Sequence, residues 1–590
     1  MTRTNRLGAA IAVAAAIACA SSGCAVIPVS GPFTIDEGDG GGSMSKPFQR
    51  MIAIPPRPRW TPQEVVDGLR AAMAAYDGDT RVLMQYLTPE AQHAWSPDGP
   101  VTVIDNGYKV AYDPKNTAEQ SAFTLTGTQV ARIEDDDRYV PANADLSWKF
   151  TVVKTPQGGY RISSITDPDT GRPVRGLLLT RADVDRAYRA TNLYYLNSPP
   201  GSEGADTNRL VVDRVRLRVR PTESFAETIV ERLLKGPSQA LQGAVYSVFP
   251  PEMRVVSVRQ ADERVVITLS GPLAAYEAIE RPLKLQLRWS LSDNNVVNGR
   301  EIEVHLDGDT AEPVTVEANL KDTGQDPAVS QAYYTSRGAV RSIDQEGPGL
   351  PVQGPAGQPN TANTDLTVSA QGDLVAARSK AGGIWVSRVA ADGKWERWIQ
   401  GDYQDLTPPS WHRDGTLWTY DRRSGTVLRC YPSGGRGAER VAAPALDGLD
   451  VTSLRIARDG VRVAVTIGKN EVRVGALTRS TGSPMLANFQ PLVLPDSQGK
   501  EDITDIAWHD GEHLLVLSNN KASQSVKEVN VGDGTTETLP GYKDRFESLA
   551  ALGDHILGNT ADEILEFNLD KQGWSPKINA DVGPPIFPLG

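Results

Sequence analysis

The sequence has 590 residues, more than one hydrophobic core usually organises, and this length predicts several domains. Its 61 basic and 73 acidic residues give a net charge of −12 with no long block of either sign, which argues against nucleic-acid binding through a clustered basic face. Three cysteines exclude a disulfide framework, and the lone Cys430 in a strand-like run is expected to be a small buried hydrophobe.

The first 23 residues have the pattern of an export signal. Arg3 and Arg6 give a positive start, and residues 7–20 form an uninterrupted apolar stretch rich in alanine. This stretch is shorter than the roughly 20 residues that a membrane-spanning helix needs. The segment 1–23 is therefore predicted to direct export rather than to span the membrane.

Small residues at 21–23 directly precede Cys24, an arrangement that resembles the lipobox of bacterial lipoproteins. The resemblance implies cleavage between Gly23 and Cys24, lipidation of Cys24, and anchoring on the extracytoplasmic face of the cell membrane. Ser21 departs from the usual Leu or Val, and the alternative is an ordinary cleaved signal. Residues 24–46 are rich in glycine and are predicted to form a flexible tether.

Residues 47–196 are predicted to form an α+β domain. A capping box at Thr61–Glu64, with proline in the first turn, begins a helix, residues 81–87 form a second helical stretch, and Thr88 begins a third. Alternating segments then predict strands at 101–104, 108–112, 121–133, 145–155 and 160–165. Helices followed by a curved antiparallel sheet suggest a cone-shaped domain of the nuclear-transport-factor-2 (NTF2-like) type.

This first domain offers few candidates for chemistry. His93 has no identifiable carboxylate partner, and Trp95 and Trp148 are more readily explained as core residues than as a ligand cage. Three consecutive aspartates at 135–137 lack the alternating oxygen ligands of a calcium loop and are interpreted as an exposed turn.

Residues 197–318 are predicted to form a second α+β domain. A strand at 209–220 precedes a helix at 222–235 with a capping serine, Ser224, and Gly236-Pro237 punctuates its end. Further strands are expected at 254–258, 265–269 and 302–306, with a helix at 283–291. The Leu-Leu-Lys-Gly-Pro run at 233–237 and the Phe249-Pro250 turn resemble the GerM-type domain of spore-germination lipoproteins, which implies an envelope module with no established catalysis.

A polar segment at 319–363 is interpreted as a linker, and residues 364–590 repeat themselves. Short apolar strands follow turn glycines at 372, 415, 460, 511 and 553, a period of roughly 40–50 residues. Such a period with Asp-Gly and Gly-Asp turns is typical of an all-β propeller. We expect five or six blades, with the C-terminal residues completing a blade together with earlier sequence.

Familiar catalytic motifs are missing from the sequence, and no catalytic residue, metal site or cofactor is predicted. His509 and His513 flank Asp510-Gly511-Glu512, but this segment aligns with the hairpin turns of the other repeats. The aspartates beside the turn glycines (Asp373, Asp414, Asp459, Asp510 and Asp554) are likewise expected to stabilise turns.

The order of these parts resembles the LpqB family of actinobacterial lipoproteins. The specific pieces are Thr88-Pro89-Glu90 before Trp95, the Leu-Leu-Lys-Gly-Pro run, the segment 408–411 and the tail 584–590. The resemblance implies an accessory lipoprotein of the MtrA–MtrB two-component system, acting on the extracellular domain of a sensor histidine kinase and thereby on cell-wall homeostasis and division.

The leading hypothesis is a non-enzymatic, membrane-tethered protein that binds one state of the kinase better than another. An alternative is a lipoprotein that binds cell-wall glycan or peptide, such as peptidoglycan, with its propeller. A weaker alternative is a propeller hydrolase, which requires clustered carboxylates or a calcium site on the ring axis.

Overall fold

The computed structural model describes residues 33–36, 49–113, 117–200, 202, 207–220, 224–261, 263–271, 276–306, 313–320, 331–345, 347–432, 437–479, 482–494, 501–521, 523–579 and 582–589. The export signal, Gly23 and Cys24 lie outside these residues. Within the expected tether, β1 (Phe33–Asp36) pairs antiparallel with β2 (Gln49–Ile52). The prediction of a flexible tether over 24–46 is therefore wrong for residues 33–36, because they are paired with a second strand. None of the described helices has the length and hydrophobicity needed to cross a membrane.

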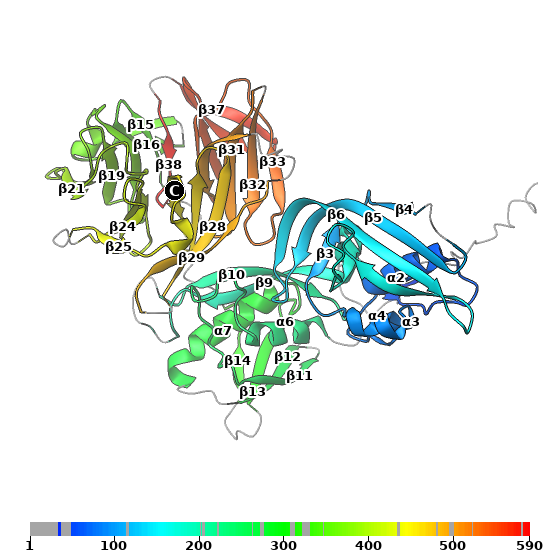
Figure 1. The fold of residues 1–590 in the computed structure, drawn as a ribbon. Coiled ribbons are helices and arrows are strands. Elements are labelled where there is room, and N and C mark those ends of the chain that lie inside the picture. The colour runs from blue at the N-terminus through cyan, green and yellow to red at the C-terminus, as the bar shows by residue number, and fades with distance from the viewer. Residues whose placement is uncertain are drawn as a thin grey trace, which may run out of the picture. The chain divides into compact units, whose positions relative to one another are not determined.

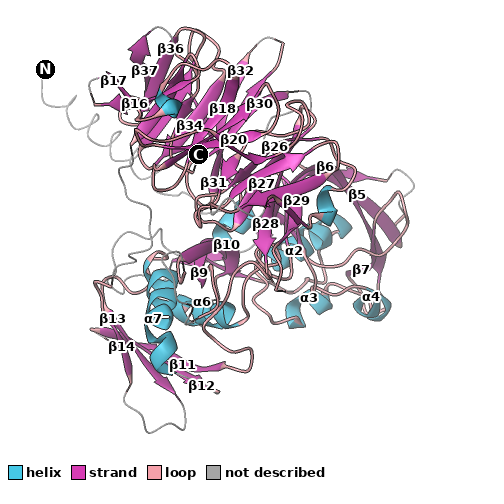
Figure 2. Cartoon of the chain, turned by 90° about the vertical axis from the view of Figure 1, so that its left-hand side faces the viewer, coloured by secondary structure: helices cyan, strands magenta, loops and turns pink. Residues whose placement is uncertain are grey.

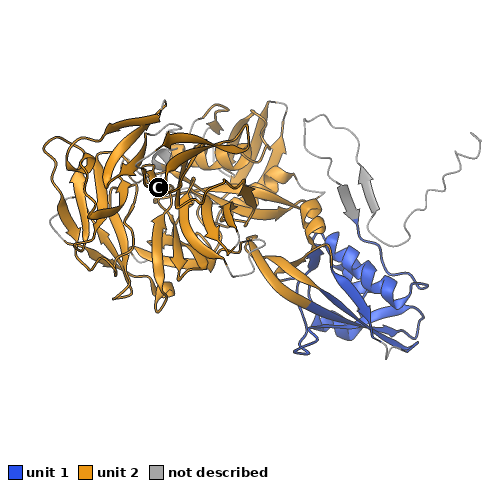
Figure 3. Ribbon diagram, turned by 90° about the horizontal axis from the view of Figure 1, so that it is seen from above, with its two compact units in different colours: residues 1–98, 108–126, 147–179 blue, residues 99–107, 127–146, 180–590 orange. Residues whose placement is uncertain are grey.

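The chain divides into two compact units (Figure 3). Unit 1 contains residues 1–98, 108–126 and 147–179, and unit 2 contains residues 99–107, 127–146 and 180–590. The first domain predicted from the sequence is therefore shared between the units, because its two longest strands run from one unit into the other.

The first domain has three helices followed by an antiparallel sheet, as predicted (Figure 1). Its elements are α2 (Pro62–Ala74), α3 (Arg81–Gln85), α4 (Pro89–Ala94), β3 (Val101–Ile104), β4 (Lys109–Tyr112), β5 (Gln120–Ile133), β6 (Tyr139–Lys154), β7 (Tyr160–Thr166) and β8 (Leu178–Thr180). The strand order is β7-β6-β5-β3-β8, with β4 on β5. The predicted capping box is present, since Thr61 Oγ1 accepts from Glu64 N at 3.3 Å. Trp95 and Trp148 are buried, which confirms their assignment to the core.

The second domain places two helices between two sheets (Figure 2). Its elements are α5 (Arg181–Ala187), β9 (Tyr188–Leu196), β10 (Leu210–Arg218), α6 (Phe225–Leu234), β11 (Arg254–Gln260), β12 (Arg264–Ser270), α7 (Tyr276–Ser292), β13 (Glu301–Leu306) and β14 (Val314–Val316). The boundary predicted at residue 196 is wrong, because β9 pairs antiparallel with β10 and packs against α7. The other sheet has the order β11-β12-β13-β14 with β12 and β13 parallel. Ser224 caps α6, as predicted.

The rest of unit 2 is a propeller of six four-stranded sheets. Blade 1 contains β18 (Asn363–Val368), β19 (Leu374–Ser379), β20 (Ile384–Arg388) and β21 (Glu396–Ile399); blade 2 contains β22 (Ser410–Trp411), β23 (Leu417–Asp421), β24 (Thr426–Cys430) and β25 (Glu439–Val441). Blade 3 contains β26 (Val451–Ile456), β27 (Arg462–Ile467), β28 (Glu471–Thr478) and β29 (Met485–Pro491); blade 4 contains β30 (Asp502–Trp508), β31 (His513–Asn519), β32 (Gln524–Asn530) and β33 (Thr536–Leu539). Blade 5 contains β34 (Ser548–Leu552), β35 (His555–Asn559), β36 (Glu563–Asn568) and β37 (Gly573–Asn579). Two short 3₁₀ helices, η1 (Pro355–Gly357) and η2 (Pro444–Leu446), join the strands.

Blade 6 joins the two ends of the propeller sequence. It contains β15 (Ala332–Ser336), β16 (Ala339–Asp344), β17 (Gly347–Pro351) and the C-terminal β38 (Pro585–Ile586), with Tyr333 opposite Ile586. The prediction of a linker at 319–363 is wrong, because β15, β16 and β17 lie in this segment. The sequence did not reveal them as a blade because their fourth strand, β38, lies at the far end of the chain. The expectation that the tail completes a blade with earlier sequence is confirmed, and the innermost strands contact one another in a closed ring.

Candidate functional site

Strand β10 carries a row of arginines on one face. Val211, Asp213, Val215 and Leu217 are buried, and Arg214 and Arg216 alternate with them. The Arg214 Nε and Arg216 Nη2 atoms lie 2.8 and 3.4 Å from Asp533 Oδ2, in the turn after β32. The side chain of Asp533 is fully buried, and although burial works to raise its pKa, the two bonds from Arg214 and Thr535 hold the pKa below its usual range.

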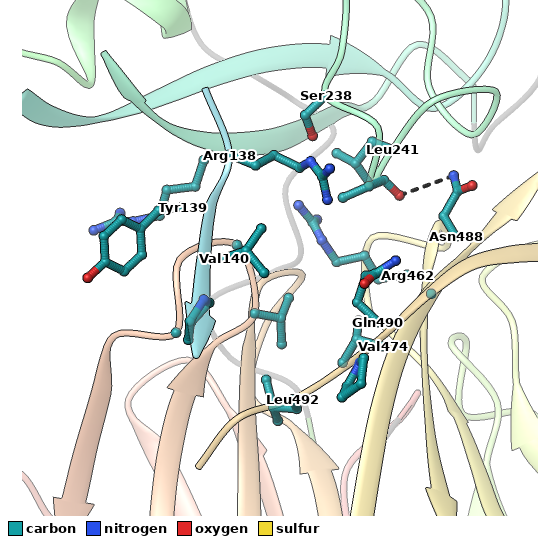
Figure 4. Close-up of a pocket in the computed structure, with 18 of the residues that line it drawn as sticks. Arg138, Tyr139, Val140, Ser238, Leu241, Arg462, Val474, Asn488, Gln490 and Leu492 are labelled. Atoms are coloured by element: carbon teal, nitrogen blue, oxygen red, sulfur yellow. Dashed lines mark hydrogen bonds between the residues drawn. The ribbon is translucent and has the colours of Figure 1, made fainter. Parts of the chain in front are cut away.

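The propeller also contacts the second domain directly. Arg462 donates to the Val212 carbonyl oxygen, and its Nη1 lies 2.7 Å from Asp459 Oδ2. Asn488 Nδ2 donates to the Ala240 carbonyl oxygen at 3.4 Å (Figure 4). It also donates to the Gln242 carbonyl oxygen at 3.0 Å. Both contacts use backbone acceptors, so they fix the position of the second domain on blade 3 without requiring a particular side chain there.

The hairpin turn between β5 and β6 is bound by the second domain. Arg232, which is 4% exposed, donates from Nε to Asp137 Oδ2 at 2.9 Å and from Nη2 to the Asp136 carbonyl oxygen at 2.7 Å. Arg138 lies 2.7 Å from Asp136 Oδ2 and donates to Gln239 at 2.8 Å. The interpretation of 135–137 as an exposed turn is therefore wrong for two of the three aspartates, because partners distant in sequence cover them.

The cavity where these three parts meet is small. It measures about 90 Å³ and lies among Arg138, Tyr139, Leu241, Arg462 and other residues (Figure 4). A water molecule occupies about 30 Å³ in the liquid, so this volume holds only a few waters. We interpret the region as a packed joint. A wider hollow of about 780 Å³ nearby runs up to Leu494, where the described residues stop, and we assign no site to it.

A larger pocket lies at one end of the propeller axis. Its volume is about 480 Å³, within the range of roughly 300–1,000 Å³ typical of ligand sites. All six blades contribute to its wall: Asp365 and Leu366 from β18, Pro408 before β22, Thr452, Ser453 and Arg455 from β26, Ile503–Ala507 from β30, Glu547–Ala550 around β34 and Pro584–Ile586 around β38. These residues lie where the innermost strands begin, which places the pocket in the mouth of the central channel.

The axial pocket contains charges of both signs. Asp365 accepts from Arg378 Nε at 2.7 Å and has a left-handed backbone φ of 49°. Asp505 accepts from the backbone N–H groups of Ile506 and Leu549, each at 2.9 Å. Burial raises the pKa of Asp505, the positive charge of Arg455 opposes that shift, and the negative charge of Asp365 adds to it.

Arg458 links three blades of the ring. This residue of blade 3 is 4% exposed and donates to the carbonyl oxygens of Ala551 at 2.7 Å and Pro588 at 2.6 Å. Ala551 belongs to blade 5 and Pro588 follows the last strand of blade 6, so these hydrogen bonds help to hold the closed ring together.

Three family models match successive parts of the sequence. The LpqB N-terminal domain matches residues 55–184, the model described as "Sporulation and spore germination" matches 192–312, and the LpqB β-propeller domain matches 338–588. The chain belongs to the LpqB lipoprotein family. Proteins named lipoprotein LpqB resemble it over their whole length: that of Thermobifida fusca is 28% identical with 99% of each chain covered, and that of Mycobacterium bovis is 23% identical with 100% of each covered.

LpqB of Streptomyces avermitilis is 27% identical and covers 99% of this chain and 98% of its own. Among solved structures, a chain in a nidogen–laminin complex matches 43% of this chain with 11% identity and a TM-score of 0.34, too low to indicate a shared overall fold. The predicted family and the multidomain fold class, with an N-terminal domain, a GerM-type domain and a propeller, are thus confirmed.

Three of the five expected turn aspartates of this LpqB-family propeller act as the sequence predicts. Asp414, Asp459 and Asp510 each accept from a backbone N–H two residues further on, at 2.9, 2.7 and 2.7 Å. The turn glycines adopt positive φ in the other repeats but not at Gly511, where a side chain would approach the Cβ atom of Asp459 at 3.0 Å. Close packing, rather than backbone conformation, explains the glycine there. Cys430 is buried, as predicted.

The two candidate histidines have separate partners. His513 Nδ1 lies 2.7 Å from Asp510 Oδ2, whereas His509 contacts Glu528 and the Gly553 carbonyl oxygen. Within the described part of the chain, no group of three His, Cys, Asp or Glu side chains is placed to hold a metal ion. These contacts indicate that His513 stabilises its own turn and that His509 links blades 4 and 5, rather than that the two histidines bind a metal ion.

The contacts of His509 predict a pH dependence of stability. Burial works to lower the pKa of His509, but the bonds to Glu528 and to the Gly553 carbonyl oxygen, together with the nearby carboxylate charges, outweigh it, so the folded-state pKa is raised above the ordinary value of about 6.5. Stability from this group is fully present below the unfolded-state pKa and is lost as pH rises through the folded-state pKa. Urea unfolding measures the fall in the free energy of unfolding between about pH 6 and about pH 9. This fall should be smaller in His509→Gln than in the wild type, and as large as in the wild type in His93→Gln, because His93 is exposed.

The axial charges and the Asp533 ion pairs were not predicted from the sequence. The sequence of β10 could have indicated the ion pairs with Asp533. Its arginines stand at every second position and therefore lie on one face of the strand, where they require acidic or backbone partners. Asp365, Arg455 and Asp505 gave no such indication. Asp365 and Arg455 are the single charges of their strands, and Asp505 shares β30 with Asp502. Only ring closure brings the three residues together.

Proposed function

We propose that this LpqB-family protein is a non-enzymatic accessory lipoprotein that binds the extracellular domain of a sensor histidine kinase. The partner is the kinase of the MtrA–MtrB two-component system, and binding affects cell-wall homeostasis and division. The family match over the whole chain supports the lipoprotein part of the proposal, and the resemblance described above is the basis for the kinase.

The observation that carries the proposal is the fixed joint between the propeller and the second domain. Asp533 is fully buried between Arg214 and Arg216, and Arg232 binds the β5–β6 turn. A preorganised surface loses little conformational entropy on binding a protein partner. Such a surface can shift a kinase equilibrium by binding one of its states better than the other.

The anchor is part of the same proposal. Cys24 carries the acyl chains, and cleavage after Gly23 makes Cys24 the first residue of the mature protein. Two or more chains give stable attachment, whereas a single chain would bind only marginally. Feeding cells a clickable palmitate analogue should label the wild type and not Cys24→Ala, which should also leave the membrane fraction. Labelling of Cys24→Ala would contradict this assignment.

Photocrosslinking in native membranes tests the kinase partner. A photoreactive amino acid is placed at exposed apolar positions of the full-length lipidated protein: Leu350 and Leu569 on the propeller, which are 78% and 45% exposed, and Val256 on the second domain, which is 50% exposed. We expect a histidine-kinase ectodomain, identified by mass spectrometry, to be joined through at least one of them. Tyr112, 60% exposed in unit 1, is the matched control position.

Two outcomes would count against the proposal. Repeated recovery of no kinase from any position would overturn the partner, and recovery of glycan strands or wall enzymes alone would favour wall binding instead. A kinase joined only through Tyr112 would retain the partner but reject the joint as the basis of binding.

A further inference from the structure

The axial pocket is a built cavity, because the backbone of three blades departs from regular pairing to form its wall. The innermost strands have bulges between Thr364 and Thr367, between Val451 and Ser453, and between Ile503 and Asp505. A β-bulge inserts an extra residue and re-aims side chains, and bulges are over-represented beside functional sites. The bulged segments place Asp365, Thr452 and Thr504 in the pocket wall.

One cationic group in the pocket has an unused donor. The Nε atom of Arg455 is buried and has no hydrogen-bond partner among the described residues. The other nitrogens of the Arg455 guanidinium also make no hydrogen bond with the described residues, and a carboxylate is the acceptor that matches a guanidinium best. A ligand carboxylate in the pocket can therefore pair with the Arg455 guanidinium.

The carboxylates of the pocket favour a positive group elsewhere on the same ligand. The two side-chain hydrogen bonds of Asp365 within the described residues both end on Oδ2, from Arg378 and Thr364, which leaves Oδ1 able to accept another bond. Glu547 is exposed at the mouth, and Lys469 is exposed on the same rim. Hydroxyl groups of Thr452, Ser453 and Ser548 add uncharged hydrogen-bonding groups to the wall.

We propose that the axial pocket binds a short zwitterionic peptide, with its free carboxylate at Arg455 and its ammonium group at Asp365 and Glu547. A simple anion would face three carboxylates, and a simple cation would leave the Arg455 donor unsatisfied. The pocket volume of about 480 Å³ accommodates a di- or tripeptide.

The proposal goes beyond the kinase partnership and does not depend on it. It is tested by isothermal titration calorimetry of the full-length protein in detergent, with trialanine as the probe. Trialanine amide lacks the carboxylate and N-acetyl-trialanine lacks the ammonium group. We expect trialanine to bind and each capped peptide to bind at least tenfold more weakly.

Matched variants separate a specific site from general effects. Arg455→Gln should weaken trialanine binding at least tenfold, whereas Arg473→Gln, which removes a half-buried partner of Glu471 on β28 of the same blade, should leave it unchanged. Glu547→Gln should weaken trialanine binding and leave the weak binding of N-acetyl-trialanine as it is. Glu547 is exposed and accepts from Asn559 Nδ2 at 3.3 Å, and the amide oxygen of glutamine can accept the same bond.

The assignment is overturned if trialanine fails to bind at millimolar concentration, or if the amide binds as tightly as the free acid. Equal binding by folded Arg455→Gln would also overturn it. If Arg455→Gln does not fold, the Glu547→Gln result decides: unchanged affinity for trialanine rejects the site.

Discussion

Deleting residues 584–590 is expected to open the propeller ring and to lower its free energy of unfolding by about 5–9 kcal/mol. The deletion removes the buried side chains of Ile586, Phe587 and Leu589, each contributing about 1.5–3 kcal/mol. It also removes the Pro588 carbonyl oxygen to which Arg458 donates. Domains are commonly stable by only 5–15 kcal/mol, so most of the propeller's stability would be lost.

Thermal unfolding followed by circular dichroism and limited proteolysis measures this effect. The truncated protein should unfold at a much lower temperature, with early cleavage within blade 6. Leu350→Ala is the control within the same blade, because this side chain is 78% exposed and its loss should change stability by no more than about 0.5 kcal/mol. Cooperative unfolding at the wild-type temperature after truncation would show that β38 does not close the ring.

Replacing Asp533 with alanine is expected to destabilise the joint by about 3–5 kcal/mol, because it leaves Arg214 and Arg216 partly buried without their carboxylate. The pKa of Asp533 is lowered in the folded state, so its contribution is present above the unfolded-state pKa of about 3.9 and is lost as pH falls through the folded-state pKa. Wild type and Asp533→Ala should therefore differ at pH 7 and converge in acid.

Chemical denaturation at pH 7 and at low pH tests both statements. Asp450→Ala is the matched control, since Asp450 pairs with Arg422 at 2.6 Å but is 60% exposed, and an exposed pair contributes at most about 1 kcal/mol. A stability difference between wild type and Asp533→Ala that persisted undiminished in acid would contradict the electrostatic origin. Equal effects of the two substitutions at pH 7 would contradict the role of burial.

The two experiments address different levels of organisation. The truncation tests how the propeller closes on itself, and Asp533 tests how the closed propeller holds the second domain. A protein that lost the joint but retained the ring would show whether partner binding requires both domains in one rigid arrangement, and Asp533→Ala supplies that protein for the crosslinking experiment.

Local features of this protein follow from its sequence alone. The caps at Thr61 and Ser224, the Asx turns at Asp414 and Asp459, and the strand-rich repeat of roughly 40–50 residues were all predicted, because each depends on residues that are neighbours in the chain. Hydrogen bonds spanning two or three residues form wherever the local sequence permits them. The repeat then indicates a propeller because each blade repeats the same short-range pattern.

Long-range pairings were decided only by the tertiary structure. Blade 6 needs Tyr333 opposite Ile586, and the joint needs Arg214 beside Asp533, which lies 319 residues further along the chain. The axial pocket needs Asp365, Arg455 and Asp505 from three blades. No local pattern encodes these contacts, because which charges meet depends on how many blades close the ring and on where bulges shift the strands.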